Sequence, residues 1–173
     1  MTLRRDEPLG KMVIVMRGIA GSGKSTKAQE FKSTLGSAVL IVSADDYFMI
    51  DGQYQFDRSK LGLAHAFCQR IVQEALQKEP DNGIHTIIVD NTNTTRREVL
   101  VYARLAHQAD AEFDMLYSDA PWAMDVEECT KRNQHGVLKE SIQAMKDRFW
   151  KYGEHPSLHE IINGDPPLEN PAS

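Results

Sequence analysis

Residues 18–25 read Gly-Ile-Ala-Gly-Ser-Gly-Lys-Ser and match the pattern G-x-x-x-x-G-K-[ST] at every fixed position. In this pattern, glycines let backbone N–H groups converge on a phosphate at the positive end of the following helix. Lys24 then reaches the β- and γ-phosphates, and the Ser25 hydroxyl contacts Mg²⁺. The pattern therefore predicts a site for a nucleoside triphosphate, with ATP and Mg²⁺ as ligands. The expected ATP contacts in this loop are Gly18, Ala20, Gly21, Ser22, Gly23, Lys24, Ser25 and Thr26.

Two aspartates follow apolar segments further along the chain. Asp45 comes after the run 38–42, and Asp90 comes directly after the run 85–89. Because parallel strands all end on one edge of their sheet, we expect both acids to face the phosphate loop. Asp45 is the candidate base that takes a proton from an acceptor hydroxyl, and Asp90 is expected in the shell of Mg²⁺. For Asp45 and its neighbour Asp46, the structural alternative is helix capping or a solvated turn.

A cluster of cations lies near the C-terminus. The segment 131–151 holds six Lys or Arg against two acidic residues. The cluster surrounds a break at His135-Gly136, where a mobile segment could close over bound phosphates. Arg132 is the candidate cation for the transferring phosphoryl group, because its guanidinium is planar and always charged. For Lys146 and Arg148 we favour an ordinary solvated helix face.

The elements needed to position these residues alternate along the chain. Unbroken apolar runs predict buried strands, and amphipathic periodicity predicts the helices between them. This alternation predicts an α/β fold of the P-loop NTPase type, a three-layer sandwich with a parallel sheet of 4–5 strands, helices on both faces and a C-terminal helical lid. Expected strands cover 12–17, 38–42, 85–89 and 112–117. Expected helices cover 24–35, a stretch around 64–76, 94–109, 121–133 and 139–151, with Trp122 and Trp150 as packing residues on the last two.

The length and composition of the chain agree with this fold prediction. With 173 residues, one domain is expected over 1–163, followed by a flexible tail at 164–173. The net charge of −5 argues against a protein that coats nucleic acid or membrane through bulk positive charge. The charged N-terminus and short apolar runs predict a cytoplasmic protein without a membrane span. Cys68 and Cys129 lack metal-ligand spacing, so we expect two reduced thiols and no zinc.

Taken together, the phosphate loop, Ser43-Ala44-Asp45-Asp46-Tyr47, Asp90-Asn91-Thr92-Asn93, Pro121-Trp122 and the segment 132–137 resemble polynucleotide-kinase-like phosphate-loop kinases. That family includes the bacteriophage 5′-hydroxyl polynucleotide kinase and the kinase-like domain of certain animal ubiquitin-ligase-binding proteins. The resemblance implies that Asp45 is the general base, that Lys24 and Ser25 contact phosphate and Mg²⁺, and that Arg132 is a lid arginine at the nucleotide. It also implies that Asn93 lies beside the acceptor.

Two positions depart from the phage enzyme. Phe48 stands where that enzyme has an arginine that holds the acceptor's phosphate, which makes Phe48 a candidate substrate residue here. His135 stands near the place of a second lid arginine. The first hypothesis is therefore an ATP-dependent kinase that acts on the 5′-hydroxyl of DNA or RNA. The alternatives are a kinase of a nucleoside, a hydroxymethylated DNA base or another small hydroxyl compound, and a non-catalytic ATP-binding regulator.

Other phosphate-loop proteins fit the sequence less well. A stretch N-K-x-D, which would read guanine, does not occur, and no D-x-x-G follows the run 85–89. A signalling GTPase is therefore not expected. A ring-forming ATPase would need a further helical domain for which the chain is short.

Overall fold

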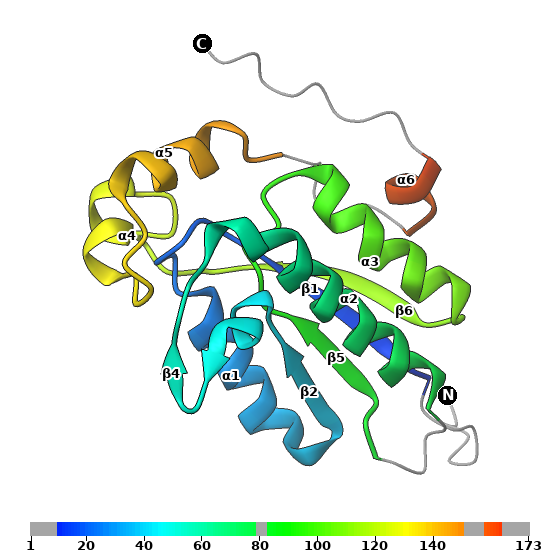
Figure 1. Cartoon of the computed structure of the whole chain (residues 1–173). Coiled ribbons are helices and arrows are strands. Elements are labelled where there is room, and N and C mark those ends of the chain that lie inside the picture. The colour runs from blue at the N-terminus through cyan, green and yellow to red at the C-terminus, as the bar shows by residue number, and fades with distance from the viewer. Residues whose placement is uncertain (1–9, 79–82, 151–157, 164–173) are drawn as a thin grey trace.

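The computed structural model describes residues 10–78, 83–150 and 158–163, in which strands and helices alternate (Figure 1). Four strands form one parallel sheet in the order β2-β5-β1-β6. Their bounds are Met12–Arg17 for β1, Val39–Val42 for β2, Thr86–Val89 for β5 and Glu112–Tyr117 for β6. In the centre of the sheet, Met12 of β1 is in register with Thr86 of β5 and with Glu112 of β6. The predicted parallel α/β fold is therefore confirmed.

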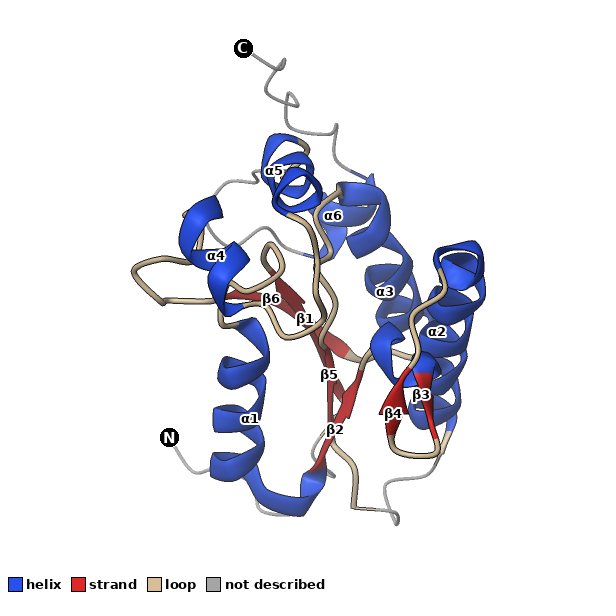
Figure 2. Cartoon of the chain, turned by 60° about the vertical axis from the view of Figure 1, so that its left-hand side comes forward, coloured by secondary structure: helices blue, strands red, loops and turns tan. Residues whose placement is uncertain are grey.

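Helices cover both faces of the sheet, and Figure 2 shows α1 on one side with α2 and α3 on the other. Two apolar clusters fill the layers, one between α1 and the sheet around Met16, Ala28 and Ile88. The larger one lies on the face covered by α2 and α3. Burial on both faces explains why the strands are unbroken apolar runs. The helices are α1 Lys24–Leu35, α2 Leu61–Gln77, α3 Arg96–Gln108, α4 Val126–Arg132, α5 Lys139–Asp147 and α6 Leu158–Asn163.

A small hairpin follows β2 and was not anticipated from the sequence. A 3₁₀ turn, η2, covers Ala44–Phe48 and leads into β3, Met49–Ile50, which pairs antiparallel with β4, Gln53–Tyr54. The turn between them is Asp51-Gly52, and both residues have positive φ, 51° and 77°. This is the backbone that a two-residue hairpin turn requires. A second 3₁₀ turn, η3 at Arg58–Lys60, then leads into α2, and η1 at Gly36–Ala38 joins α1 to β2.

The lid helices differ from the prediction at two ends. The helix expected from residue 121 begins only at Val126, because the Asp125 side chain caps it by accepting a hydrogen bond from the Glu128 N–H. The second lid helix, expected to reach 151, ends at Asp147. Trp122 and Trp150 therefore lie outside helices, although Trp150 is a core residue at 2% exposure.

Some expectations concern parts of the chain that the structure leaves undescribed. Residues 164–173, predicted to be a tail, lie outside the described residues, and the single domain over 1–163 stays a prediction. Among the helices that are described, none combines the length and apolar character needed to cross a bilayer.

Candidate functional site

The phosphate loop joins β1 to α1 in the conformation that its glycines permit. Gly21 and Gly23 have φ values of 81° and 89°, in the left-handed region. A Cβ atom on Gly21 would overlap the carbonyl oxygen of Cys129 in α4, so the loop packs directly against the lid. Lys24 is the first residue of α1, and its side chain makes no hydrogen bond or ion pair with any described residue. The loop thus presents backbone N–H groups and a free ammonium group at a helix N-terminus, an arrangement suited to phosphate.

Two buried oxygens at this edge have no hydrogen-bond partner within the described part of the chain. They are Ser22 Oγ in the phosphate loop and Asp90 Oδ1 just after β5. Buried polar atoms are nearly always paired in folded proteins, so such atoms point to a partner outside the chain. A triphosphate with its hydrated Mg²⁺ fits both, because Ser22 could donate to a phosphate and Asp90 could accept from metal-bound water. The residues present therefore fit these ligands.

Hydrogen bonds hold the loops after three strands side by side. The N–H of Gly18, after β1, donates to the Thr92 carbonyl at 3.0 Å. The N–H of Ala44, after β2, donates to Oδ1 of Asn91 at 2.8 Å. Thr92 and Asn91 both lie in the loop after β5. Asp45, Asp90 and the phosphate loop therefore border the same edge of the sheet, as expected from parallel strands.

The adjacent aspartates Asp45 and Asp46 have different surroundings. The carboxylate of Asp46 accepts from the N–H of Ser43 at 3.2 Å and closes a capping box on η2. Burial raises the pKa of Asp46, with the negative charges of Asp45 and Asp90 adding to this effect. Capping therefore accounts for Asp46. Asp45, by contrast, is half-exposed and accepts a hydrogen bond from Tyr54 Oη at 2.9 Å.

The two other residues expected at the acceptor, Phe48 and Asn93, are both buried. Phe48 is 2% exposed and packs in the core, with its ring 5.1 Å from that of Phe56. Asn93 is also 2% exposed, and its amide donates to the carbonyls of Met16 and Asn91. Neither side chain is open to solvent, and contact of either with an acceptor stays a prediction. Asn93 fixes the loop after β5, with φ at +43°.

The lid carries Arg132 at the end of α4. Its guanidinium lies 3.8 Å from the centre of the Trp122 ring, and its Nε is 3.4 Å from Glu128 Oε2. The cation predicted for the phosphates is thus stacked on an aromatic ring of the lid itself. The segment 133–137 is ordered by Asn133, which accepts from the Val137 N–H at 2.7 Å and donates to the Thr130 carbonyl at 2.7 Å.

Two further side chains of the lid contact the rest of the site. His135 Nε2 lies 3.5 Å from Asp45 Oδ2, so the lid reaches the candidate base. Arg148 is exposed, as expected, and its Nε also donates to Thr94 Oγ1 at 2.9 Å. The lid therefore contacts the sheet edge on both the β2 side and the β5 side.

Arg17, the last residue of β1, is a residue of the site that sequence reasoning missed. It is fully buried, and its guanidinium donates to the carbonyls of Asn93 and Thr94 and to Tyr117 Oη at 2.8, 3.1 and 2.9 Å. It also lies over the Phe149 ring, 4.5 Å from the ring centre. Desolvation by burial lowers its pKa, and the neighbouring Tyr117 partly offsets this. The one signal for it in the sequence is an arginine that ends an apolar strand.

A small cavity of about 160 Å³ lies between the phosphate loop and the end of β6. It is lined by Arg17, Gly18, Ser22, Tyr117, Ser118, Ala123, Met124 and Phe149. The buried arginine therefore shares this cavity with residues of the phosphate loop and with Phe149, which follows α5.

Comparison with known proteins agrees with this architecture. Residues 13–151 match the family model AAA_33, described as an AAA domain. The human NEDD4-binding protein 2 is 37% identical over 150 residues, which are 87% of this chain and 8% of that protein. The 2′,3′-cyclic-nucleotide 3′-phosphodiesterase of Mus musculus is 24% identical over 136 residues, which are 79% of this chain and 30% of that protein. The chain thus spans less than a third of the length of these curated relatives.

Among solved structures, a chain of the Pnkp1/Rnl/Hen1 RNA repair complex superposes with a TM-score of 0.61 at 20% identity. The match covers 86% of this chain and 47% of that chain. At this identity the likeness concerns the fold alone, which is that of P-loop kinases.

Proposed function

The chain belongs to the AAA_33 family of P-loop kinase-like domains, and we propose that it is an ATP-dependent phosphotransferase acting on the 5′-hydroxyl of a DNA or RNA end. The observation that carries this proposal is the meeting of the phosphate loop with a half-exposed carboxylate, Asp45, at one edge of the sheet. A catalytic base is not needed merely to bind a nucleotide. The likeness to a chain of an RNA repair complex supports a nucleic-acid acceptor.

In the proposed reaction, the acceptor hydroxyl attacks the γ-phosphorus while Asp45 takes its proton. A new bond forms between the acceptor oxygen and phosphorus, the bond from phosphorus to the β,γ-bridging oxygen breaks, and ADP leaves with that oxygen. The phosphate loop and Lys24 stabilise the charge on the phosphates, and Arg132 adds a positive charge when the lid engages them. Ser25 and Asp90 would hold Mg²⁺, which supplies further positive charge at the β- and γ-phosphates when bound.

The direct test of the base is Asp45→Asn, which keeps the shape of the side chain but removes its proton-accepting charge. We expect ATP affinity to stay within about twofold and transfer of labelled phosphate to a 5′-hydroxyl oligonucleotide to fall by about 10² or more. Asp51→Asn is the matched control, because Asp51 is exposed and asparagine also tolerates its positive φ. Normal turnover in Asp45→Asn would refute the assignment.

An acceptor panel tests the substrate class. Labelled ATP is offered with 5′-hydroxyl oligonucleotides, nucleosides, DNA that contains a hydroxymethylated base, and sugars. Transfer to oligonucleotide ends supports the proposal, whereas transfer only to a small molecule replaces it with that kinase activity. ATP binding without transfer to any acceptor would indicate a regulator instead. The phosphodiesterase named among the relatives is matched over less than a third of its length, so its activity is not carried over.

A further inference from the structure

Two aromatic rings contact the candidate base, Asp45, and a third ring lies beside one of them. The Tyr54 hydroxyl donates to its Oδ1 at 2.9 Å, and His135 Nε2 lies 3.5 Å from its Oδ2. The Tyr54 and His135 rings are 4.4 Å apart between centres. Phe56 follows Tyr54 by two residues, and the two rings are nearly parallel at 16°, with centres 6.4 Å apart. We call Tyr54, Phe56 and His135 the ring surface.

Phe56 is the open part of this surface. Its side chain rests edge-on against the buried Phe48, yet 53% of the residue is exposed. An isolated exposed apolar residue needs no explanation in a folded protein. Here, however, the exposed ring lies nearly parallel to a second ring that hydrogen-bonds the candidate base, so an exposed aromatic side chain lies near the reacting group. Exposed aromatic side chains bind unpaired nucleobases by stacking.

Tyr54 ties the ring surface to the chemistry. Its pKa is raised, first by burial and then by the adjacent Asp45 carboxylate, so the hydroxyl stays protonated and keeps donating. The hydrogen bond fixes one oxygen of Asp45, and the carboxylate retains further lone pairs for an acceptor hydroxyl. A group bound on the ring surface would therefore lie next to an oriented carboxylate.

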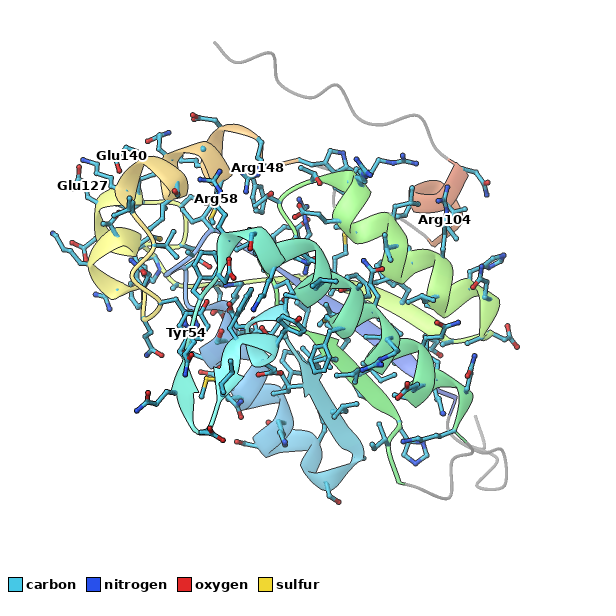
Figure 3. All side chains as sticks on the ribbon, viewed as in Figure 1. Tyr54, Arg58, Arg104, Glu127, Glu140 and Arg148 are labelled. Carbon is cyan, nitrogen blue, oxygen red and sulfur yellow. The ribbon has the colours of Figure 1, made fainter. Side chains whose placement is uncertain are left out.

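A cation, Arg58, lies in the segment that leads from β4 to α2, shortly after Tyr54 and Phe56. The Arg58 side chain is exposed and has no hydrogen bond or ion pair within the described ranges, and the carboxylate of its neighbour Asp57 is already engaged by Ser59 and Lys60. Figure 3 shows Arg58 near the start of α2, separated in this view from Tyr54, which lies near β4. A free guanidinium at this place complements the phosphates of a strand that continues past the rings.

We propose that the ring surface stacks the base of the acceptor's first nucleotide, and that Arg58 contacts a backbone phosphate further along the same strand. This inference rests on the proposed function and narrows its acceptor to an end with an unpaired terminal base. The ring faces of Tyr54 and Phe56 offer no hydrogen-bonding groups for a hydroxyl-rich compound, whereas a base is flat and apolar on its face. A duplex end would have to fray before its first base could reach the rings.

The test compares two single-stranded oligonucleotides that share a 5′-hydroxyl and differ only in the first residue, which either carries a base or is abasic. Binding is measured by fluorescence anisotropy with a 3′ dye, and transfer is measured with labelled ATP. We expect the normal oligonucleotide to bind about tenfold more tightly than the abasic one. Phe56→Leu should weaken binding of the normal oligonucleotide by about tenfold and leave the abasic one unchanged.

Leu63→Ala is the control for loss of an exposed apolar side chain, because Leu63 is 57% exposed on α2 and has no ring. It should change neither affinity. Arg58→Gln should weaken the binding of both oligonucleotides equally and reduce the salt dependence of binding by about one phosphate contact. Equal affinity for the two oligonucleotides, or an equal loss on both in Phe56→Leu, would overturn the stacking proposal.

The outcomes separate this inference from the proposed function. If both oligonucleotides are phosphorylated with the same KM, the ring surface does not bind the base although the kinase assignment stands. If the normal oligonucleotide binds preferentially but receives no phosphate, the stacking site stands and the kinase assignment fails.

Discussion

Replacing the buried Arg17 with methionine tests whether this residue holds the site together. Methionine is unbranched and uncharged, so the change removes the three hydrogen bonds to Asn93, Thr94 and Tyr117. The Thr94 carbonyl keeps the N–H of Trp150 as a donor, and Tyr117 is 43% exposed and can bond water. Only the Asn93 carbonyl then loses its partner in the interior.

The free energy follows from these contacts. A buried carbonyl without a partner costs about 1–3 kcal/mol. The contacts of a desolvated cation with aromatic rings contribute up to about 2 kcal/mol. The variant no longer pays the desolvation cost of the buried guanidinium charge, which offsets part of this loss. We therefore expect Arg17→Met to lower the free energy of unfolding by about 2–3 kcal/mol.

The assay is urea unfolding followed by circular dichroism, with titration of ATP on the folded protein. Arg97→Met is the control, because Arg97 is exposed on α3 and should change stability by less than about 0.5 kcal/mol. An unfolding free energy within about 0.5 kcal/mol of the original, together with weaker ATP binding, would refute the reasoning. Arg17 would then act on the nucleotide across the cavity rather than through the fold.

Three further outcomes are expected. Gly21→Ala should abolish ATP binding, measured by isothermal titration, because the new methyl group meets the α4 backbone. Gly36→Ala, with similar φ but open surroundings, should only lower the melting temperature in thermal unfolding. Thr95→Ala should cost about 1 kcal/mol in chemical unfolding by removing the α3 capping box, and Thr95→Ser should restore most of it. Arg132→Ala should slow phosphate transfer without changing the melting temperature. ATP should alter Trp122 fluorescence only while Arg132 is present, and an equal fluorescence change in the original protein and the variant would contradict this.

The phosphate loop and the parallel sheet could be predicted because their signals are local. A complete motif follows an apolar strand and begins a helix, and both neighbours have the expected periodicity. The predicted start of α4 is wrong because Pro121, a common first helical residue, lies here in a turn before the helix. The correct signal, Asp125 three residues before Glu128, was also local and could have been used.

The remaining features depend on contacts between distant segments. The burial of Phe48 is set by rings that come later in the chain, and the pattern of residues around Asp45 could not reveal it. The hairpin after η2 has strands of two residues, too short for alternation to show, although Asp51-Gly52 is a recognisable turn pair. The partners of Arg17 come from the ends of three other segments, so its burial could not be read from β1 alone.

The central place of β1 in the sheet has a consequence for how the protein acquires its site during synthesis. Although β1 is made first, its partners are β5 and β6, whose residues begin at Thr86 and Glu112. The strand that carries the phosphate loop therefore has no sheet partner until the ribosome has made β5, which begins 69 residues after β1 ends. Contacts between segments so far apart in sequence form slowly, because a long loop must close first. A nucleotide can thus stabilise the β1 strand and its phosphate loop only after β5 has been made, so the loop reaches its binding conformation later in folding than its place in the sequence suggests.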